Sequence, residues 1–203
     1  MDELTHLIEQ INTAAKSKER VIVAIVGAPG SGKSTLVAKL QQTLNRSAVV
    51  PMDGFHLDNC VLQAKGLMAR KGAPESFDAA GYYQLLSRIK YSKETVYAPI
   101  FDRRADLSRA GAIEICSDKK VILTEGNYLL LQQPSWCQLA ELFDLTVFLQ
   151  VPMATLRERL IERWLAQGLA IDEAVVRAES NDLINAKMVD AHSAPADVLV
   201  THF

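Results

Sequence analysis

Five short runs of apolar residues recur along the chain and predict buried β-strands. They cover residues 21–26, 48–50, 121–123, 145–149 and 198–200. Continuous apolar runs rich in β-branched residues are typical of strands that are covered on both faces, as in a parallel sheet. Helical patterns separate most of these runs, so the sequence predicts an α/β fold with a doubly wound, mostly parallel sheet and helices on both faces.

Three further segments complete the pattern. Apolar residues at helical spacing predict an amphipathic helix over residues 3–17. Residues 54–80, rich in Gly, Asp and Lys, and residues 151–182, where Arg and Glu crowd a helical pattern, interrupt the alternation of strands and helices. We find no internal repeat and no linker, so residues 1–203 are predicted to form a single domain.

Composition narrows the classes of protein that fit this pattern. Of 203 residues, 49% are apolar, and 22 Lys and Arg residues against 24 Asp and Glu residues give a formal net charge of −2. The chain is long enough to bury a sizeable core. Without a basic block there is no electrostatic footprint for nucleic acid, and no apolar run approaches the about 20 residues that span a bilayer. We therefore predict neither a nucleic-acid partner nor insertion into a membrane.

The cysteines and the N-terminus predict a cytoplasmic protein. Cys60, Cys116 and Cys137 are odd in number and widely spaced, with no pair at metal-site spacing. We interpret them as reduced thiols that mostly fill the core. The acidic N-terminal residues lack the basic region of a secretory signal.

A glycine-rich sequence follows the first apolar run directly. It reads Gly27-Ala28-Pro29-Gly30-Ser31-Gly32-Lys33-Ser34-Thr35 and fits the pattern G-x-x-x-x-G-K-[ST]. Backbone N–H groups of such a loop surround phosphate oxygens, and the following helix adds its N-terminal partial charge. Lys33 would then reach the β and γ phosphates and Ser34 would ligate Mg²⁺. The alternative is a Gly-rich turn with an incidental Lys, but the position between a strand and a helix favours a phosphate-binding loop.

Two acids follow buried strands close to this loop. Asp53 comes after the second apolar run and Glu125 after the third, where α/β sheets bind their ligands. Phosphoryl transfer needs one carboxylate for the acceptor hydroxyl and another for Mg²⁺ or its water. Either acid alone is equally typical of a turn or a helix cap. His56 and Asp58 are secondary candidates that would otherwise cap or solvate the next segment.

The chain lacks motifs of other nucleotide-binding classes. It has neither the Asn-Lys-x-Asp sequence nor an Asp-x-x-Gly sequence after a strand that regulatory GTPases use. The third strand ends in Glu125-Gly126, whereas mechanical ATPases typically carry an Asp-Glu pair. These features favour a small-molecule kinase.

Five segments in fixed order resemble the superfamily of uridine kinases, phosphoribulokinases and bacterial pantothenate kinases. They are the phosphate loop, Pro51-Met52-Asp53-Gly54-Phe55-His56, Lys71-Gly72-Ala73-Pro74-Glu75-Ser76-Phe77-Asp78, Tyr97-Ala98-Pro99-Ile100-Phe101-Asp102 and Thr124-Glu125-Gly126-Asn127-Tyr128. The segment from Arg70 to Asp78 looks most like pantothenate kinases. Together with the residues after Asp53, it is similar to the bacterial group named fructose transport system kinases.

This resemblance implies roles for individual residues. Asp53 would be the catalytic base and Glu125 the carboxylate of the metal site, and the acceptor would lie near His56, Phe101, Asp102 and Arg103. Two departures bear on the acceptor. Gly72 stands where uridine kinases carry Asp, and Asp102-Arg103 stand where pantothenate kinases carry Ser-His, so uridine and pantothenate are both disfavoured.

An arginine-rich helical pattern predicts a short helical lid over residues 154–170. Arg159 and Arg163 share one helix face and would stabilise the charge of the transferred phosphoryl group, whereas Arg157 would point outward. The neighbouring Glu158 and Glu162 leave open a solvated helix of mixed charge.

The C-terminal part offers further candidates for the acceptor site. Asn181 and Asn185 share a helix face, and the resemblance to pantothenate kinases makes both substrate-binding candidates. Polar residues on an exposed helix are the alternative. His202 is a candidate for the surroundings of the adenine base.

The sequence therefore predicts an ATP- and Mg²⁺-dependent kinase for a hydroxyl group of a small polar metabolite, such as the sugar fructose. Catalysis would rest on Asp53, Lys33, Arg159 and Arg163. A nucleoside or pantothenate-type vitamin kinase is one alternative, and an ATP-binding regulatory component of a transport system is another. The formation of a homodimer stays open.

Overall fold

A computed structural model describes residues 3–201 of the chain, so His202 lies outside the described residues. Its centre is a five-stranded sheet in the order β2-β5-β1-β6-β7, in which all neighbouring strands pair in parallel. The strands are β1 (Val21–Gly27), β2 (Ser47–Pro51), β5 (Val121–Gly126), β6 (Leu145–Leu149) and β7 (Val198–Val200). Each contains one of the five predicted apolar runs, so the predicted strands and the parallel α/β class are confirmed.

Strand β1 explains why its apolar run is continuous. Alternate side chains of a strand point to opposite faces of the sheet. Val21, Val23 and Ile25 belong to the core beneath α1 (Glu3–Lys16) and α2 (Lys33–Thr43). The intervening residues belong to the core on the opposite face, so every residue of β1 is buried.

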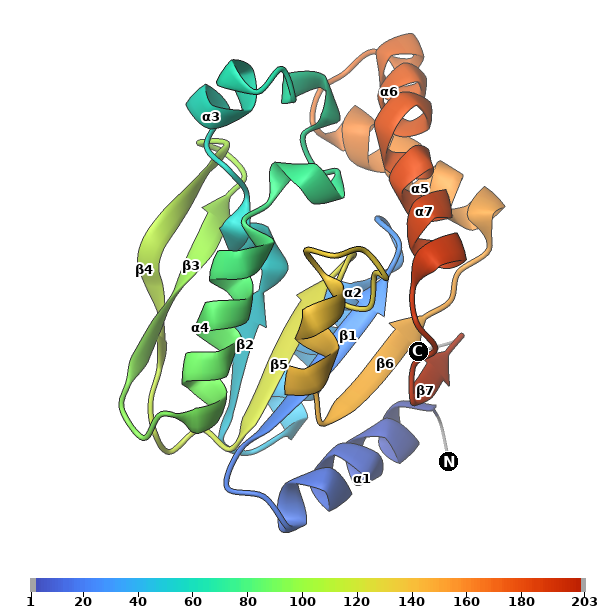
Figure 1. The fold of residues 1–203 in the computed structure, drawn as a ribbon. Coiled ribbons are helices and arrows are strands. Elements are labelled where there is room, and N and C mark those ends of the chain that lie inside the picture. Colours follow the sequence, from blue (N-terminus) through green and yellow to red (C-terminus); the bar gives the residue numbers. More distant parts are fainter. Residues whose placement is uncertain (1–2, 202–203) are drawn as a thin grey trace.

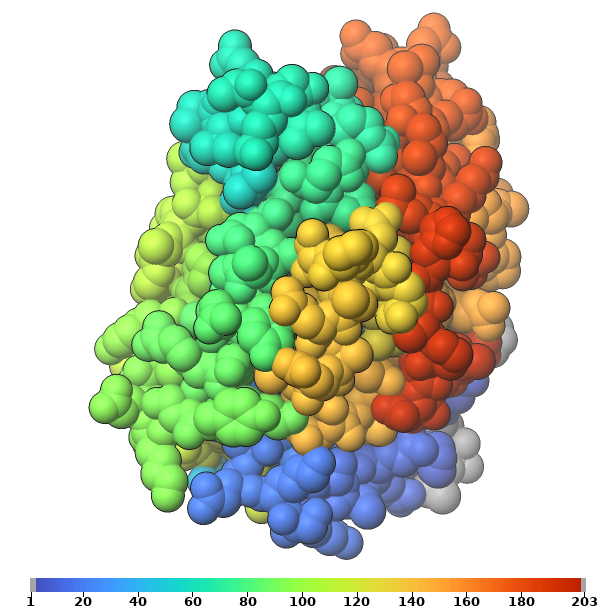
Figure 2. Space-filling view, viewed as in Figure 1, coloured from blue at the N-terminus to red at the C-terminus, as the bar shows by residue number. Residues whose placement is uncertain are grey.

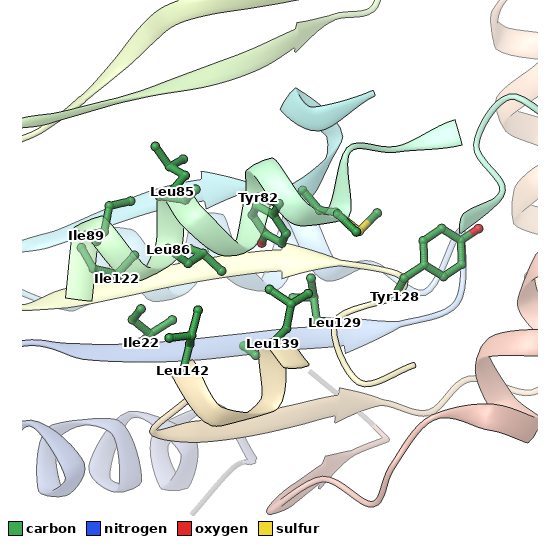
Figure 3. Close-up of a cluster of buried hydrophobic side chains, with 14 of the residues drawn as sticks. Ile22, Tyr82, Leu85, Leu86, Ile89, Ile122, Tyr128, Leu129, Leu139 and Leu142 are labelled. Carbon is green, nitrogen blue, oxygen red and sulfur yellow. The ribbon is translucent and has the colours of Figure 1, made fainter. Parts of the chain in front are cut away.

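The second face of the sheet is covered by α4 (Ala79–Tyr91) and by the 3₁₀-helix η4 (Cys137–Leu142). Figure 3 shows Leu86 and Ile89 of α4 above Ile22 and Ile122 of the sheet, with Leu142 of η4 beside them. Helices therefore cover both faces of the sheet, as the sequence predicts.

The C-terminal part forms a helical layer at the carboxyl ends of the strands (Figure 1). It consists of α5 (Met153–Ala166), α6 (Ile171–Arg177), a π-helical turn η5 (Ala178–Asp182) and α7 (Leu183–His192). This layer has its own small apolar core, which includes Ala28 of the glycine-rich loop. The C-terminal helices are thus packed directly against that loop.

An antiparallel hairpin, β3 (Val96–Asp102) and β4 (Leu107–Ile115), lies beside the main sheet (Figure 1). The sequence pattern does not predict it, because most residues of β4 are exposed and no apolar run marks the strand. The irregular segment before α4 contains α3 (Asn59–Ala64) and three 3₁₀ turns, η1 (Met52–Phe55), η2 (Met68–Arg70) and η3 (Pro74–Ser76).

The prediction that the cysteines mostly fill the core is wrong. All three are free thiols, but Cys60 and Cys137 are exposed and Cys116 is only partly buried. The turns that carry Cys60 and Cys137 bury leucines on their inner sides and leave the thiols outside.

Among the helices of residues 3–201, none combines the length and the apolar character that crossing a bilayer requires.

Candidate functional site

The glycine-rich loop turns sharply between β1 and α2. Gly30 and Gly32 adopt φ angles of 79° and 95°, a left-handed conformation that glycine adopts at little cost. Within residues 3–201 the buried Ser31 Oγ has no hydrogen-bond partner. The loop is tight, ends at a helix N-terminus and contains an unpaired hydroxyl group. These features fit a bound phosphate chain.

Lys33 is buried at the base of this loop. Its Nζ donates to Gly27 O at 3.0 Å, to Ala28 O at 2.9 Å and to Asn127 Oδ1 at 2.8 Å. Burial lowers the pKa of Lys33 to about 8, although the carboxylates of Glu125 and Asp53 counteract this shift. The loop thus holds a desolvated cation at the place where phosphate oxygens would arrive.

Ser34 and Glu125 place two side-chain oxygens beside Lys33. Ser34 Oγ donates to Glu125 Oε1 at 3.1 Å. Burial raises the pKa of Glu125, and the nearby Lys33 ammonium opposes that shift. Within residues 3–201 no group of three or more His, Cys, Asp or Glu side chains could hold a metal. Two protein oxygens fit Mg²⁺, which takes most of its ligands from phosphate and water.

Asp53 lies in η1, just beyond the carboxyl end of β2. Pro51 of β2 pairs with Glu125 of β5, so Asp53 lies two residues beyond the position that pairs with Glu125. Asp53 Oδ2 accepts from Arg103 Nη2 at 2.9 Å, and no donor within residues 3–201 contacts the other oxygen. The ion pair therefore orients the carboxylate and leaves one oxygen open to a ligand.

Aromatic rings form a wall next to Asp53. The His56 ring lies between Phe77 and Phe101, with centroid distances of 4.0 Å and 4.5 Å. His56 Nδ1 contacts Asp53 O at 2.8 Å. Burial lowers the pKa of His56, an effect that the nearby Asp53 carboxylate opposes.

Asp102 points elsewhere. Its Oδ1 accepts from the backbone N–H groups of Arg104 and Ala105, each at 3.1 Å, and its Oδ2 lies 3.5 Å from Arg109 Nε. Asp102 therefore stabilises the turn of the hairpin. It faces away from its neighbour in β3, because alternate residues of a strand point to opposite sides.

The predicted lid segment forms α5 and the turn after it. Arg159 Nη1 donates to Gly30 O at 3.3 Å, and Arg163 Nη2 lies 3.5 Å from Asp182 Oδ2. Arg157 turns away and pairs with Glu179 at 2.7 Å.

Asn181 and Asn185 are buried, with 8% and 1% of their surface exposed. The alternative of polar residues on an exposed helix is therefore wrong. Both amides contact the segment from Arg70 to Gly72.

One cavity of about 730 Å³ unites these groups. Of the predicted site residues, its wall includes Pro29, Gly30, Gly32, Lys33, Ser34, Thr35, Asp53, His56, Phe101, Arg103, Glu125, Arg159, Arg163, Asn181 and Asn185. The wall does not include Gly27, Ala28, Ser31 or Asp102. The first three lie behind the loop surface, where the carbonyls of Gly27 and Ala28 hold Lys33.

Sequence reasoning assigned no role to several residues of the wall, among them Lys71, Asp106, Asn127, Trp164, Arg177 and Asp182. Asn127 follows the Glu125-Gly126 strand end, so the strand-end rule alone could have found it. Trp164 and Asp182 carry no such signal, because their hydrogen bond joins two different helical elements, α5 and η5.

Comparisons with known proteins agree with this geometry. The family model described as "Phosphoribulokinase / Uridine kinase family" matches residues 22–167. A "Putative uridine kinase" of Schizosaccharomyces pombe is 34% identical over 201 residues, covering 91% of this chain and 84% of that protein. A pantothenate kinase of Enterococcus faecalis is 30% identical over 162 residues, covering 75% and 51%.

A crystal structure from Silicibacter sp. TM1040 is similar over almost the whole chain. It is described as a "putative fructose transport system kinase" and is 44% identical, with a TM-score of 0.92. The match covers 98% of this chain and 100% of that one.

Proposed function

Since this chain belongs to the phosphoribulokinase / uridine kinase family, whose members are small-molecule kinases, we propose that it transfers the γ-phosphoryl group of ATP to a hydroxyl group of a small polar metabolite. A sugar such as fructose is the first candidate acceptor. We also assign the protein to the cytoplasm, on the basis of its three free cysteines.

One observation carries the proposal. The Asp53 carboxylate lines the same cavity as Lys33 and the Ser34–Glu125 pair. Asp53 follows β2, the strand that pairs with the strand of Glu125. A carboxylate at this position would face the end of a phosphate chain bound by the loop. It is therefore suited to accept the proton of an attacking hydroxyl group.

The other residues of the cavity would act mainly through charge and position. The loop residues 27–35 would hold the triphosphate, with Lys33 close to the γ-phosphoryl group. Ser34 and Glu125 would hold Mg²⁺, which when bound neutralises charge on the phosphate oxygens. Arg159 and Arg163 would stabilise the transferred group from α5. Preorganised cations in a partly dry cavity are effective because they need little reorganisation during the reaction.

The acceptor end of the cavity favours a compact polar molecule. Its wall combines the His56 and Phe101 rings with the charged Asp53 and Arg103. Aromatic rings can pack against the C–H face of a sugar while the charged groups contact its hydroxyls. The name of the similar Silicibacter protein agrees with fructose as the first compound to test.

A coupled ADP-release assay tests the proposal. The purified chain, with ATP and Mg²⁺, is screened against fructose, other sugars, uridine and pantothenate. At least one acceptor is expected to raise ADP release well above the rate with water alone. No increase with any of them would contradict the kinase proposal and favour an ATP-binding regulatory protein.

Asp53→Asn tests the catalytic base with the same assay. We expect kcat to fall by about 100- to 10,000-fold, the usual contribution of a positioned base. ATP affinity should change little, because Asp53 lies at the acceptor end. Asp190→Asn, at an exposed position of α7, is the control and should keep its activity. A near-normal rate for Asp53→Asn would remove Asp53 from this role.

A further inference from the structure

The π-helical turn η5 presents two adjacent buried polar residues to different neighbours. Asn181 and Asp182 are only 8% and 7% exposed, although they follow each other in sequence. A π-turn holds one more residue than an α-turn and is often found at functional sites. Here it directs Asn181 to the acceptor side of the cavity and Asp182 to α5.

Asp182 supports the arginine that faces the phosphate end. Its Oδ2 accepts from Trp164 Nε1 at 2.7 Å and lies 3.5 Å from Arg163 Nη2. The Arg163 guanidinium also stacks over the Trp164 ring, 5.2 Å from its centroid. Among the described residues, Asp182 is the one acid within ion-pair distance of Arg163. The orientation of Arg163 therefore depends on a buried carboxylate that lies on another helix.

Asn181 supports the segment that walls the acceptor end. Its Oδ1 accepts from Arg70 Nη1 at 2.6 Å, and its Nδ2 donates to Lys71 O at 2.8 Å. Asn185 repeats the arrangement, with Arg70 Nη2 at 3.1 Å and Gly72 O at 3.4 Å. The two amides thus hydrogen-bond to the guanidinium group of Arg70 and to the carbonyl groups of the next two residues.

The opposite side of the same segment is fixed as well. Lys71 Nζ donates to Asn59 Oδ1 at 2.6 Å and pairs with Asp106 Oδ1 at 2.8 Å. Residues 70–72 therefore bridge the C-terminal helices and the β3–β4 hairpin. Figure 2 shows the segment around residues 65–75 directly against the C-terminal helices.

We propose that Asp182 and Asn181 are positioning residues of the kinase site, Asp182 acting through Arg163 and Asn181 acting through Arg70. This inference rests on the proposed function. It differs from the prediction that Asn181 binds the acceptor, because it assigns the effect of Asn181 to its hydrogen bonds with Arg70 and the Lys71 carbonyl. Both residues belong to η5, and each of them positions groups at a different end of the cavity.

The first experiment tests whether Asp182 acts through Arg163. Asp182→Asn keeps an oxygen for Trp164 but removes the charge that holds Arg163. We expect kcat to fall about 10- to 100-fold, as for small misplacements of a catalytic group, while the acceptor KM changes less than about twofold. Asp190→Asn, which makes the same chemical change at an exposed site of α7, should match the wild type.

A double-mutant cycle separates positioning from a general structural loss. In an Arg163→Gln background, Asp182→Asn should cause no further loss, because its target is already gone. Fluorescence of Trp164, assigned with Trp164→Phe, should change in Asp182→Asn and stay constant in Asp190→Asn. If the losses of the two single variants multiply, or if Asp182→Asn keeps the wild-type kcat, the proposal for Asp182 is overturned.

The second experiment tests whether Asn181 acts through Arg70. Asn181→Ala should raise the acceptor KM by about tenfold and leave the dissociation constant of ATP unchanged. Arg70→Gln should have the same effect, and the double variant should lose no more than either single one. An Asn181→Ala loss that persists undiminished in the Arg70→Gln background would show direct acceptor binding and overturn the proposal for Asn181.

These outcomes are distinguishable from failure of the proposed function. If the wild-type chain phosphorylates no acceptor, the kinase proposal fails by itself. The double-mutant cycle of Asp182 is then repeated with the dissociation constant of ATP as the measured quantity. The second substitution should again cause no additional loss of affinity. Losses of affinity that multiply would overturn the proposal for Asp182. For Asn181, melting temperatures of the same four variants replace KM, and additive losses would exclude action through Arg70.

Discussion

Single residues of the site divide into those that a motif identifies and those that only a contact identifies. Lys33 and Ser34 belong to one contiguous loop pattern, so their place at the cavity could be predicted from sequence. The burial of Asn181 could not, because it depends on Arg70, which lies 111 positions away. Side chains whose environment is made by distant segments escape local reasoning, even where a resemblance points to them.

Lys33 should make ATP binding depend on pH. Its pKa is lowered to about 8 by burial, so the empty site loses the ammonium charge as the pH rises through that value. Phosphate oxygens favour the charged form and raise the pKa again. ATP binding without Mg²⁺ should therefore take up a proton as the pH rises above about 8, and it should weaken at still higher pH.

Calorimetry in buffers of different ionisation enthalpy measures this proton uptake. Lys33→Arg is the control, because arginine keeps its charge throughout the range and should bind ATP without uptake. Equal uptake by both proteins would assign the proton to another group and contradict the role of Lys33.

The elements of the fold differ in how clearly the sequence marks them. The parallel strands could be predicted because both of their faces are buried, which makes each one a continuous apolar run. Strand β4 is mostly exposed, and η5 differs from an α-helix only in its hydrogen-bond spacing, so neither leaves such a run. These two elements nevertheless shape the acceptor end, β4 by pairing with β3 and η5 through Asn181.

Gly54 should be essential to how β3 packs on η1. A Cβ added at Gly54 would lie 2.5 Å from Pro99 O and 2.8 Å from Pro99 C, both backbone atoms that cannot rotate away. Gly54→Ala must therefore displace the hairpin, which also carries Arg103, the partner of Asp53. We expect a loss of about 1–3 kcal/mol from overpacking, or about 2–12 °C in Tm, together with reduced kcat.

Gly66→Ala provides the comparison, measured by thermal unfolding and the ADP-release assay. A Cβ there meets nothing within 4 Å, although φ is +69°, so some loss of Tm is expected without loss of kcat. If both variants lost Tm and kept full activity, the contact between η1 and β3 would be irrelevant to the site.

Residues from several separate segments of the chain line the cavity. They belong to the loop after β1, to η1 and the segment that follows it, to the turn between β3 and β4, to the end of β5 and to the C-terminal helices. Because no single element contains the site, a ligand that fills the cavity should stabilise the fold as a unit. A ligand at 100 times its dissociation constant adds about 2.7 kcal/mol to the free energy of unfolding.

Thermal unfolding can therefore identify the acceptor without turnover. ADP with Mg²⁺ at that concentration should raise Tm by about 5–11 °C at 2–4 °C per kcal/mol, and the true acceptor should raise it further. Arg70→Gln should lose most of the increase due to the acceptor and keep that due to ADP, since Arg70 fixes only the acceptor wall. Equal losses of both increases would show that the two ends of the cavity are not held separately, and would count against the division of labour between Asn181 and Asp182.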